Sequence, residues 1–167
     1  MRDTIELDGF DYKILAALQS DAAMTNQQIG EQVCLSASQV SRRRQRLEAS
    51  GVVRRYRAEL DSAKLGLGVT AFVSVTLSHH SPENAEVFRQ LVSRTPAVQA
   101  AYTMTGDMDY LLQVCASDLK GLGKLINEQL LPNTGVQSVR SAIALEVLKD
   151  DMELPLAGVY PRARGGK

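Results

Sequence analysis

Arginine side chains are concentrated in one short stretch of this chain. Residues 42–57 contain seven arginines and a single acid, Glu48. Guanidinium groups pair with phosphates or bind guanine bidentately, and short polar side chains reach base edges. In "SQVSRRRQRLEASG", residues 38–51, the polar residues come first and the arginines follow, as expected of a helix that reads DNA. The predicted DNA-binding residues are Ser38, Gln39, Ser41, Arg42, Arg43 and Arg46.

The alternative for this stretch is a solvated helix whose charges have no special role. The near absence of acids to pair with the arginines disfavours that alternative, and so do two capped helices predicted just before it. Gln39 remains ambiguous, because its side chain can serve a helix cap or a base. The whole chain has 19 basic and 19 acidic residues, so a positive face has to come from their distribution.

Arg44 differs from the arginines around it. It lies four residues after Val40 and three before Leu47, which form the apolar side of the predicted helix, so it should face the core or its edge. A buried, unpaired arginine is costly. We expect the stem of Arg44 to pack at the edge of the core while its guanidinium reaches water or an acid.

A second group of polar residues lies in "TGDMDY", residues 105–110. The spacing alone favours a hairpin turn, in which Gly106 and Asp107 suit the backbone. The alternative is a small-ligand site, because turn amides can hold a carboxylate and a nearby acid can hold an ammonium group.

The remaining reactive residue types do not form a convincing catalytic site. No nucleophile, second base or metal cluster accompanies Asp107 and Asp109. His79 and His80 are expected in an exposed loop, and a metal or haem role for them is disfavoured. Cys34 is expected to be a small buried residue. The prediction is therefore no catalytic residue, no metal and no cofactor.

The composition is typical of a globular protein of one domain or two small ones, with 167 residues, 44% hydrophobic and 23% charged. The two cysteines are far apart and outside any metal-type spacing, which fits a reduced, cytoplasmic setting. The first residues lack the apolar core of a signal peptide, and no apolar run is long enough to span a bilayer.

Residues 1–60 are predicted to form a winged helix-turn-helix DNA-binding domain. Three helices are expected, and capping boxes at Thr25 and Ser36 open the second and third. Gly51 is a natural stop for the third helix. The alternating residues of "VVRRYRAEL", 52–60, then indicate a short strand or ribbon. Short helices with a tight turn, followed by a ribbon, make the winged helix-turn-helix pattern.

The rest of the chain is predicted to form a separate domain. Residues 61–68, "DSAKLGLG", are the linker. Residues 69–150 show the order β-α-β-β-α-β of a ferredoxin-like domain, with a last long strand over 136–148, so the whole fold is α+β. One sheet face carries apolar residues that no helix covers, which predicts a partner subunit. Residues 151–167 are expected to be a mobile tail.

The chain resembles the Lrp/AsnC family, the "feast/famine" transcription regulators of bacteria and archaea. The resemblance covers nearly the whole chain and rests on "LDGFDYKILAALQSDA", "LSASQVSRRRQRLEASGVVRRY", "LG" at Leu67-Gly68 and "GDMDYLL". Arg44 departs from the pattern, because relatives usually have an aliphatic residue there. The departure puts in doubt how the recognition helix packs.

The resemblance implies an N-terminal DNA-binding domain and a C-terminal effector and assembly domain. It implies homodimers formed through the C-terminal sheets, and often octamers. Effectors in the family are commonly free amino acids bound between dimers near the glycine-aspartate loop. The resemblance therefore favours an effector site over a simple turn, and its residues would be Gly106, Asp107, Asp109 and Tyr110.

Together these observations predict a non-catalytic, sequence-specific DNA-binding transcriptional regulator of the Lrp/AsnC type that an amino acid modulates. One alternative is a tetrapyrrole (sirohaem-type) decarboxylase of related architecture, which would use His79 or His80. The intact arginine helix argues against it. The other alternative is a ligand-sensing assembly module whose DNA-binding half is vestigial.

Overall fold

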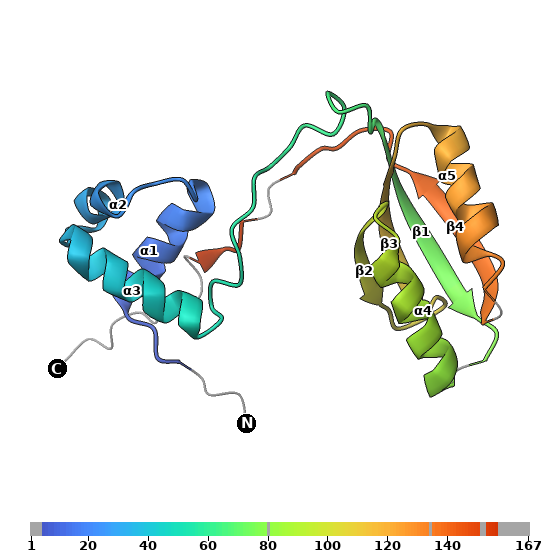
Figure 1. Ribbon diagram of the computed structural model, residues 1–167, viewed down its shortest axis with the longest axis horizontal. Helices are drawn as coiled ribbons and strands as arrows, with labels where there is room; N and C mark the ends of the chain where they lie inside the picture. The colour runs from blue at the N-terminus through green and yellow to red at the C-terminus, as the bar shows by residue number, and fades with distance from the viewer. Residues whose placement is uncertain (1–4, 80, 134, 151–152, 157–167) are drawn as a thin grey trace. The chain divides into compact units, whose positions relative to one another are not determined.

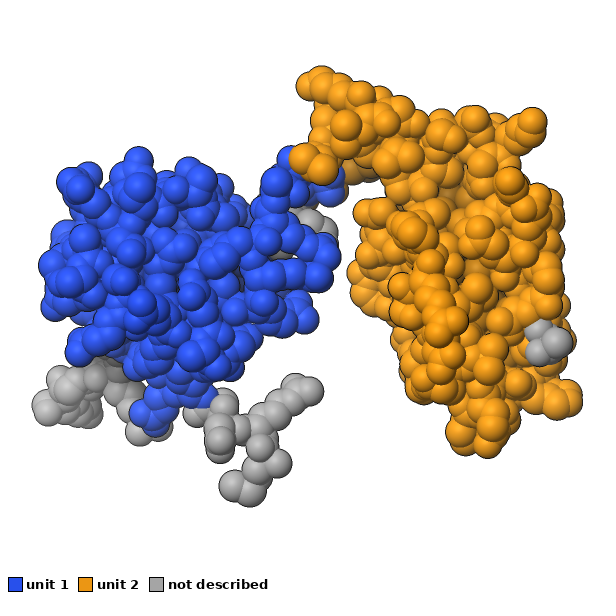
Figure 2. Space-filling view, in the orientation of Figure 1, with its two compact units in different colours: residues 1–59, 150–167 blue, residues 60–149 orange. Residues whose placement is uncertain are grey.

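The computed structural model describes residues 5–79, 81–133, 135–150 and 153–156. The chain divides into two compact units, one made of residues 1–59 and 150–167 and the other of residues 60–149 (Figure 2). Each unit has its own hydrophobic core. Each can therefore be described by itself.

Three helices make up the described core of the first unit. They are α1 (Gly9–Ser20), α2 (Asn26–Val33) and α3 (Ala37–Ala49) (Figure 1). Each starts with a capping box, at Asp8, Thr25 and Ser36 respectively. The cap side chain accepts from a backbone N–H inside the helix, which removes an otherwise unsatisfied donor. The capping boxes predicted at Thr25 and Ser36 are confirmed.

The helix-turn-helix depends on a close approach between α2 and the turn that follows it. A Cβ on Gly30 would lie 2.5 Å from the carbonyl oxygen of Leu35, so only glycine fits without a shift. Cys34 ends α2 with φ 59°, in the left-handed region. The prediction that Cys34 is buried is wrong, because its place at this turn leaves it exposed.

The ribbon predicted for residues 52–60 is not formed. This segment is irregular and mostly exposed. A β-ribbon needs a second strand to accept and donate its backbone hydrogen bonds. Within the part of the chain that the structure describes, all four strands belong to the second unit. The helix-turn-helix is therefore confirmed, but its wing has no strand.

The second unit is an antiparallel sheet with helices along one face (Figure 1). Its elements in chain order are β1 (Val69–Leu77), α4 (Pro82–Arg94), β2 (Val98–Thr103), β3 (Tyr110–Ala116), α5 (Leu119–Leu125), the π-helical turn η1 (Ile126–Leu130) and β4 (Val136–Ile143). The sheet order is β2-β3-β1-β4, and neighbouring strands pair antiparallel. The predicted ferredoxin-like β-α-β-β-α-β order is confirmed.

The two faces of this sheet have different surroundings. On β1, Ala71, Val73 and Val75 are completely buried in the core that the helices complete. The register places Phe72, Leu111 and Tyr102 on the opposite face. Phe72 and Tyr102 are exposed there. Within the described part of this unit, the second face thus exposes two large apolar side chains and is called the open face below.

The last strand is shorter than predicted, because β4 ends at Ile143 and not at residue 148. Its neighbour β1 begins at Val69, and the final contact is from the N–H of Ala144 to the carbonyl of Thr70. Beyond that point only Val69 of β1 remains, so the pairing cannot extend to residue 148.

Most of the predicted tail, residues 151–167, lies outside the described residues. Its described part, residues 153–156, contacts α1. Leu154 donates its N–H to Oε1 of Gln19 at 2.9 Å, and its carbonyl accepts from Nε2 of the same side chain at 3.2 Å. This contact belongs entirely to the first unit.

Candidate nucleic-acid interface and effector site

The first turns of α3 present short polar side chains and one exposed arginine. Ser38, Gln39 and Arg42 are exposed, and Ser41 is half-buried. Oε1 of Gln39 accepts from the N–H of Ser36 at 3.0 Å, which completes the capping box. The cap uses the oxygen of Gln39, so its amide nitrogen is the part suited to donate to a base.

Arg43 and Arg46 turn out to have acidic partners on and beside α1. Nη1 of Arg43 is 2.8 Å from Oδ2 of Asp8 and 2.8 Å from Oδ1 of Asp11. Arg46 pairs with the other oxygen of Asp11. Hydrogen bonds to Asp8 and then Asp11 raise the pKa of Arg43. The expectation that these arginines lack acids was wrong, because the acids come from a distant part of the sequence.

Asp11 requires the two arginines as partners, because its carboxylate is buried. Its side chain is 0% exposed, and a buried carboxylate is tolerated only when it is paired and hydrogen-bonded. Arg43 and Arg46 supply the opposite charge, and the N–H of Asp8 donates to Oδ2 at 2.9 Å. The spacing "LDGFD" placed both acids on one turn, but only the packing of α1 on α3 brought them to the arginines.

All three predicted DNA-binding arginines nevertheless line one concave site. Asp8, Arg42, Arg43 and Arg46 line a cavity of about 390 Å³ on the first unit, called the arginine hollow below. The three guanidinium groups around this open space suit an anion with several oxygens, such as a phosphate diester, while the carboxylate of Asp8 opposes one.

Arg44 lies at the edge of the buried stripe, as predicted. Its side chain is 19% exposed and its head is paired. Nη1 donates to Oδ1 of Asn26 at 3.0 Å, and Nη2 donates to Oη of Tyr56 at 3.2 Å. The hydroxyl of Tyr56 in turn donates to Oε1 of Glu48 at 2.7 Å. The guanidinium also lies 5.4 Å from the centre of the Tyr56 ring. Arg44 thereby joins α2, α3 and the segment after α3.

The predicted effector residues have three different environments. Gly106 has φ 106°, and both it and Asp107 are exposed in the turn between β2 and β3. Asp109 is tied to the sheet, since its Oδ2 accepts from the N–H of Leu77 at 2.7 Å. Tyr110 is buried and stacks on Phe88 with ring centres 4.5 Å apart. The turn expected from spacing is present, and of its two acids Asp107 is the more exposed.

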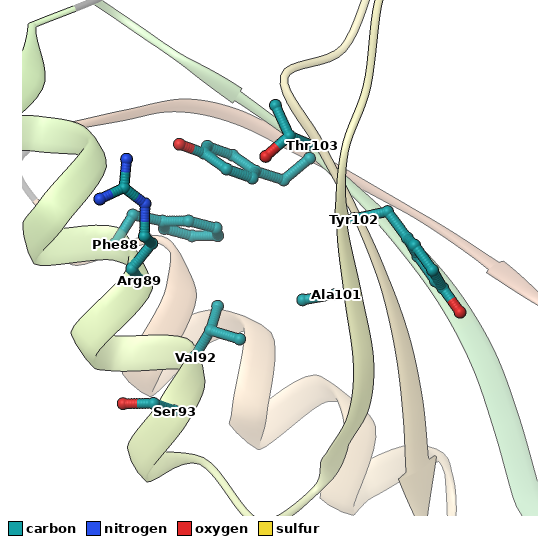
Figure 3. A pocket seen from close by; sticks show the side chains of 8 residues that line it. Phe88, Arg89, Val92, Ser93, Ala101, Tyr102 and Thr103 are labelled. Atoms are coloured by element: carbon teal, nitrogen blue, oxygen red, sulfur yellow. The ribbon is translucent and has the colours of Figure 1, made fainter. Parts of the chain in front are cut away.

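Sequence reasoning did not find the cavity beside Tyr110. This α4–β2 pocket has a volume of about 270 Å³ and is lined by Phe88, Arg89, Val92, Ser93, Ala101, Tyr102, Thr103 and Tyr110. In Figure 3, Arg89 and Thr103 lie at one end of the space and the Tyr102 ring points away from α4. The spacing of Phe88 and Val92 indicates that they lie on the same face of a helix. Nothing in the sequence indicates that this face lies against β2.

The other residues considered for chemistry are not brought together. His79 is exposed as expected, and His80 lies outside the described residues. Among the residues described, no group of three or more His, Cys, Asp or Glu side chains could hold a metal ion. In the same part of the chain, no helix has both the length and the apolar character needed to cross a membrane.

Both units resemble domains of known proteins. Residues 7–48 match the model of the AsnC-type helix-turn-helix domain, and residues 70–154 match that of the Lrp/AsnC ligand binding domain. The chain is 36% identical over 152 residues to a leucine-responsive regulatory protein of Rhizobium meliloti, covering 91% of this chain and 97% of the relative. It is 35% identical over 150 residues to the DNA-binding transcriptional activator DecR of Escherichia coli, covering 90% and 99% respectively.

Solved structures agree with the sequence matches. The transcriptional regulator NMB0573 of Neisseria meningitidis, solved as a complex with L-Met, superposes with a TM-score of 0.88 at 35% identity, covering 92% of this chain and 99% of that one. An AsnC family regulator of Agrobacterium tumefaciens gives 0.85 at 37% identity, covering 91% and 99%. With its helix-turn-helix and its ligand binding domain both matched, this chain belongs to the Lrp/AsnC family of DNA-binding transcriptional regulators.

Proposed function

We propose that α3 is the helix through which this regulator reads its operator. The observation that carries the proposal is the exposed start of α3 beside the arginine hollow. Ser38, Gln39 and Ser41 would reach base edges, because recognition helices contact bases through their N-terminal residues. Arg42, Arg43 and Arg46 would bind phosphate or guanine.

The three arginines should not contribute equally. Arg42 is exposed, and within the described residues it makes no ion pair, so its charge is available to DNA. Asp11 partly neutralises Arg43 and Arg46, so these two arginines attract a phosphate less strongly than Arg42 does. We therefore expect Arg42 to dominate the electrostatic part of binding.

Replacing Arg42 with alanine tests this proposal. The variant should bind operator DNA more weakly, and the slope of log K against log salt should fall by about one for each phosphate that is no longer neutralised. Binding is measured by fluorescence titration at several salt concentrations. Arg94→Ala serves as the control, because Arg94 is an exposed arginine at the end of α4 in the second unit. Equal affinity and equal salt slope for both variants would reject the assignment of α3.

We further propose that a free amino acid binds at the turn between β2 and β3. Support comes from the ligand binding domain match over residues 70–154 and from the L-Met complex of the Neisseria meningitidis protein. Of the predicted residues Gly106, Asp107, Asp109 and Tyr110, Asp107 is the acid best placed for the effector's ammonium group. Oδ2 of Asp109 already accepts from the N–H of Leu77, and the backbone amides of the exposed turn at Gly106 suit a carboxylate.

We propose that the protein is cytoplasmic and forms a homodimer through the open face of the sheet. Such dimers would assemble further into octamers. Phe72 and Tyr102 are exposed on that face, and large apolar side chains gathered on one face are typical of a protein interface. In a symmetric dimer, two copies of α3 would enter successive major grooves about one helical turn apart.

A further inference from the structure

The arginine hollow contains one feature that a simple phosphate site would lack, which is the carboxylate of Asp8. We propose that Asp8 occupies the place on Arg43 that a DNA phosphate takes in the complex, so that DNA binding exchanges one anion for the other. The inference rests on the proposed contact between α3 and DNA. It makes Asp8 a determinant of affinity that weakens binding in the wild-type protein.

The two acids that hold Arg43 are very different in exposure. Asp11 is 0% exposed, while the side chain of Asp8 is 51% exposed, although both lie 2.8 Å from Nη1 of Arg43. Separating Asp11 from the arginine would leave a carboxylate buried without its partner, which is strongly unfavourable. Separating Asp8 returns a half-exposed carboxylate to water at little cost. Asp8 is thus the partner that can leave.

The capping role of Asp8 does not oppose this exchange, because each of its oxygens has a separate task. Oδ1 accepts from the N–H groups of Phe10 and Asp11 at 2.9 and 3.0 Å and so begins α1. Oδ2 contacts Arg43. A phosphate could therefore replace Oδ2 on Arg43 while Oδ1 continues to cap the helix.

Arg43 would stay in position during the exchange. Asp11 holds the same nitrogen, and the guanidinium lies 5.5 Å from the centre of the Phe10 ring. These two contacts fix the arginine beside Arg42 and Arg46 in the hollow. An arriving phosphate therefore meets Arg43 already in position, and it needs to replace only Asp8.

Asp8 is charged under ordinary conditions, as the exchange requires. Burial by itself would raise the pKa of Asp8, but the N–H of Asp11 and the guanidinium of Arg43 outweigh it and lower the pKa overall. The carboxylate is then ionised at neutral pH and repels a phosphate that enters the same hollow.

Asp8→Asn separates charge from capping, because asparagine is an equally good N-cap residue. The variant should bind operator DNA more tightly, by about two- to fivefold, which is the worth of a partly exposed ion pair. Asp21→Asn is the matched control. Asp21 is an exposed acid of the same unit whose Oδ1 accepts from the N–H of Ala23, so it measures the general effect of removing one negative charge.

A double-mutant cycle with Arg43 tests the exchange directly. In an Arg43→Ala background the gain from Asp8→Asn should fall to that of Asp21→Asn, because no arginine remains for Asp8 to occupy. Circular dichroism and thermal unfolding establish that each variant is folded before its affinity is measured.

Two results would overturn the inference. Weaker binding by Asp8→Asn would mean that Asp8 positions Arg43 for DNA, and a gain no larger than that of Asp21→Asn would mean that no exchange takes place. If Arg42→Ala weakens binding in the same assay, the DNA-binding role of α3 survives either result. If Arg42→Ala leaves binding unchanged, it is the proposed interface that fails.

Discussion

Arg43 and Arg44 are adjacent in the chain but have different partners. Both flank the buried stripe of Val40 and Leu47, and their side chains are similarly covered, at 21% and 19% exposed. Arg43 turns to the acids of α1 and its cap, and Arg44 turns to Asn26 on α2 and to Tyr56. The edge of an apolar stripe can thus accommodate arginine on either side when each head finds a partner.

We predict that Arg44→Leu frees the segment after α3. Leucine can keep the apolar packing of the stem, but it cannot bond to Asn26 or Tyr56. Residues 52–60, which contain Arg54, Arg55 and Arg57, should then be cleaved by trypsin several times faster in the folded protein. Arg42→Leu is the control, because it removes the same number of tryptic sites from α3. Equal cleavage rates for the two variants would show that Arg44 does not restrain the segment.

At the scale of elements, helices begin where the sequence places a residue whose side chain can cap a helix. The N-cap residues Thr25 and Ser36 each begin the helix predicted from them. The ends of strands did not follow local chemistry. Residues 52–60 and 145–148 alternate in sequence, yet the structure describes no strand there. The pairing of β4 with β1 reaches only Ile143, and Ala144 makes the last backbone hydrogen bond to β1.

Gly30 is the position where the helix-turn-helix is least tolerant of substitution. The Cβ of Gly30→Ala would be 2.5 Å from the Leu35 oxygen, which is backbone and cannot swing away. We expect the first unit to lose about 1–3 kcal/mol of unfolding free energy, as in other overpacked sites. Amide hydrogen exchange in α2 and α3 reports the stability of this unit separately.

Gly123→Ala provides the opposite expectation in the second unit. Nothing lies within 4 Å of a Cβ at Gly123 in α5, so alanine should raise local stability by about 0.5–1 kcal/mol through its better helix propensity.

An unchanged stability for Gly30→Ala would contradict the close approach at the turn.

At the scale of the whole molecule, a DNA-binding unit and a ligand binding unit are joined in one chain. A ligand can change DNA binding only if it binds one arrangement or assembly better than another. We propose that such a difference arises at the open sheet face or at the exposed β2–β3 turn of the second unit.

An amino-acid screen by thermal shift, with size measured by sedimentation, tests this coupling. A true effector should raise the melting temperature and change the state of assembly at the same concentrations. Asp107→Asn should abolish the shift and leave the melting temperature without ligand unchanged, because Asp107 is exposed. Asp21→Asn controls for the removal of one charge. A full shift retained by Asp107→Asn would remove that residue from the effector site.

The candidate site was partly predictable for an identifiable reason. Residue types near the start of α3 indicate DNA contact, because side-chain chemistry and helical spacing are properties of a few consecutive residues. The partners of Arg43 and Arg46 were missed, since Asp8 and Asp11 lie over thirty residues away. The α4–β2 pocket was missed for the same reason, because its walls come from separate elements.

The sequence by itself determined the helix starts and the β-α-β-β-α-β order, and it supplied the residues that we propose to contact DNA, because all of these depend on neighbours in the chain. Only the tertiary structure decided which arginines are paired with acids. Packing α1 against α3 buried Asp11 between Arg43 and Arg46 and left Arg42 exposed. A buried carboxylate must be paired, so the charge that looked uniform along "SRRRQR" is divided. Arg43 and Arg46 neutralise Asp11, and Arg42 is left for the proposed contact with DNA.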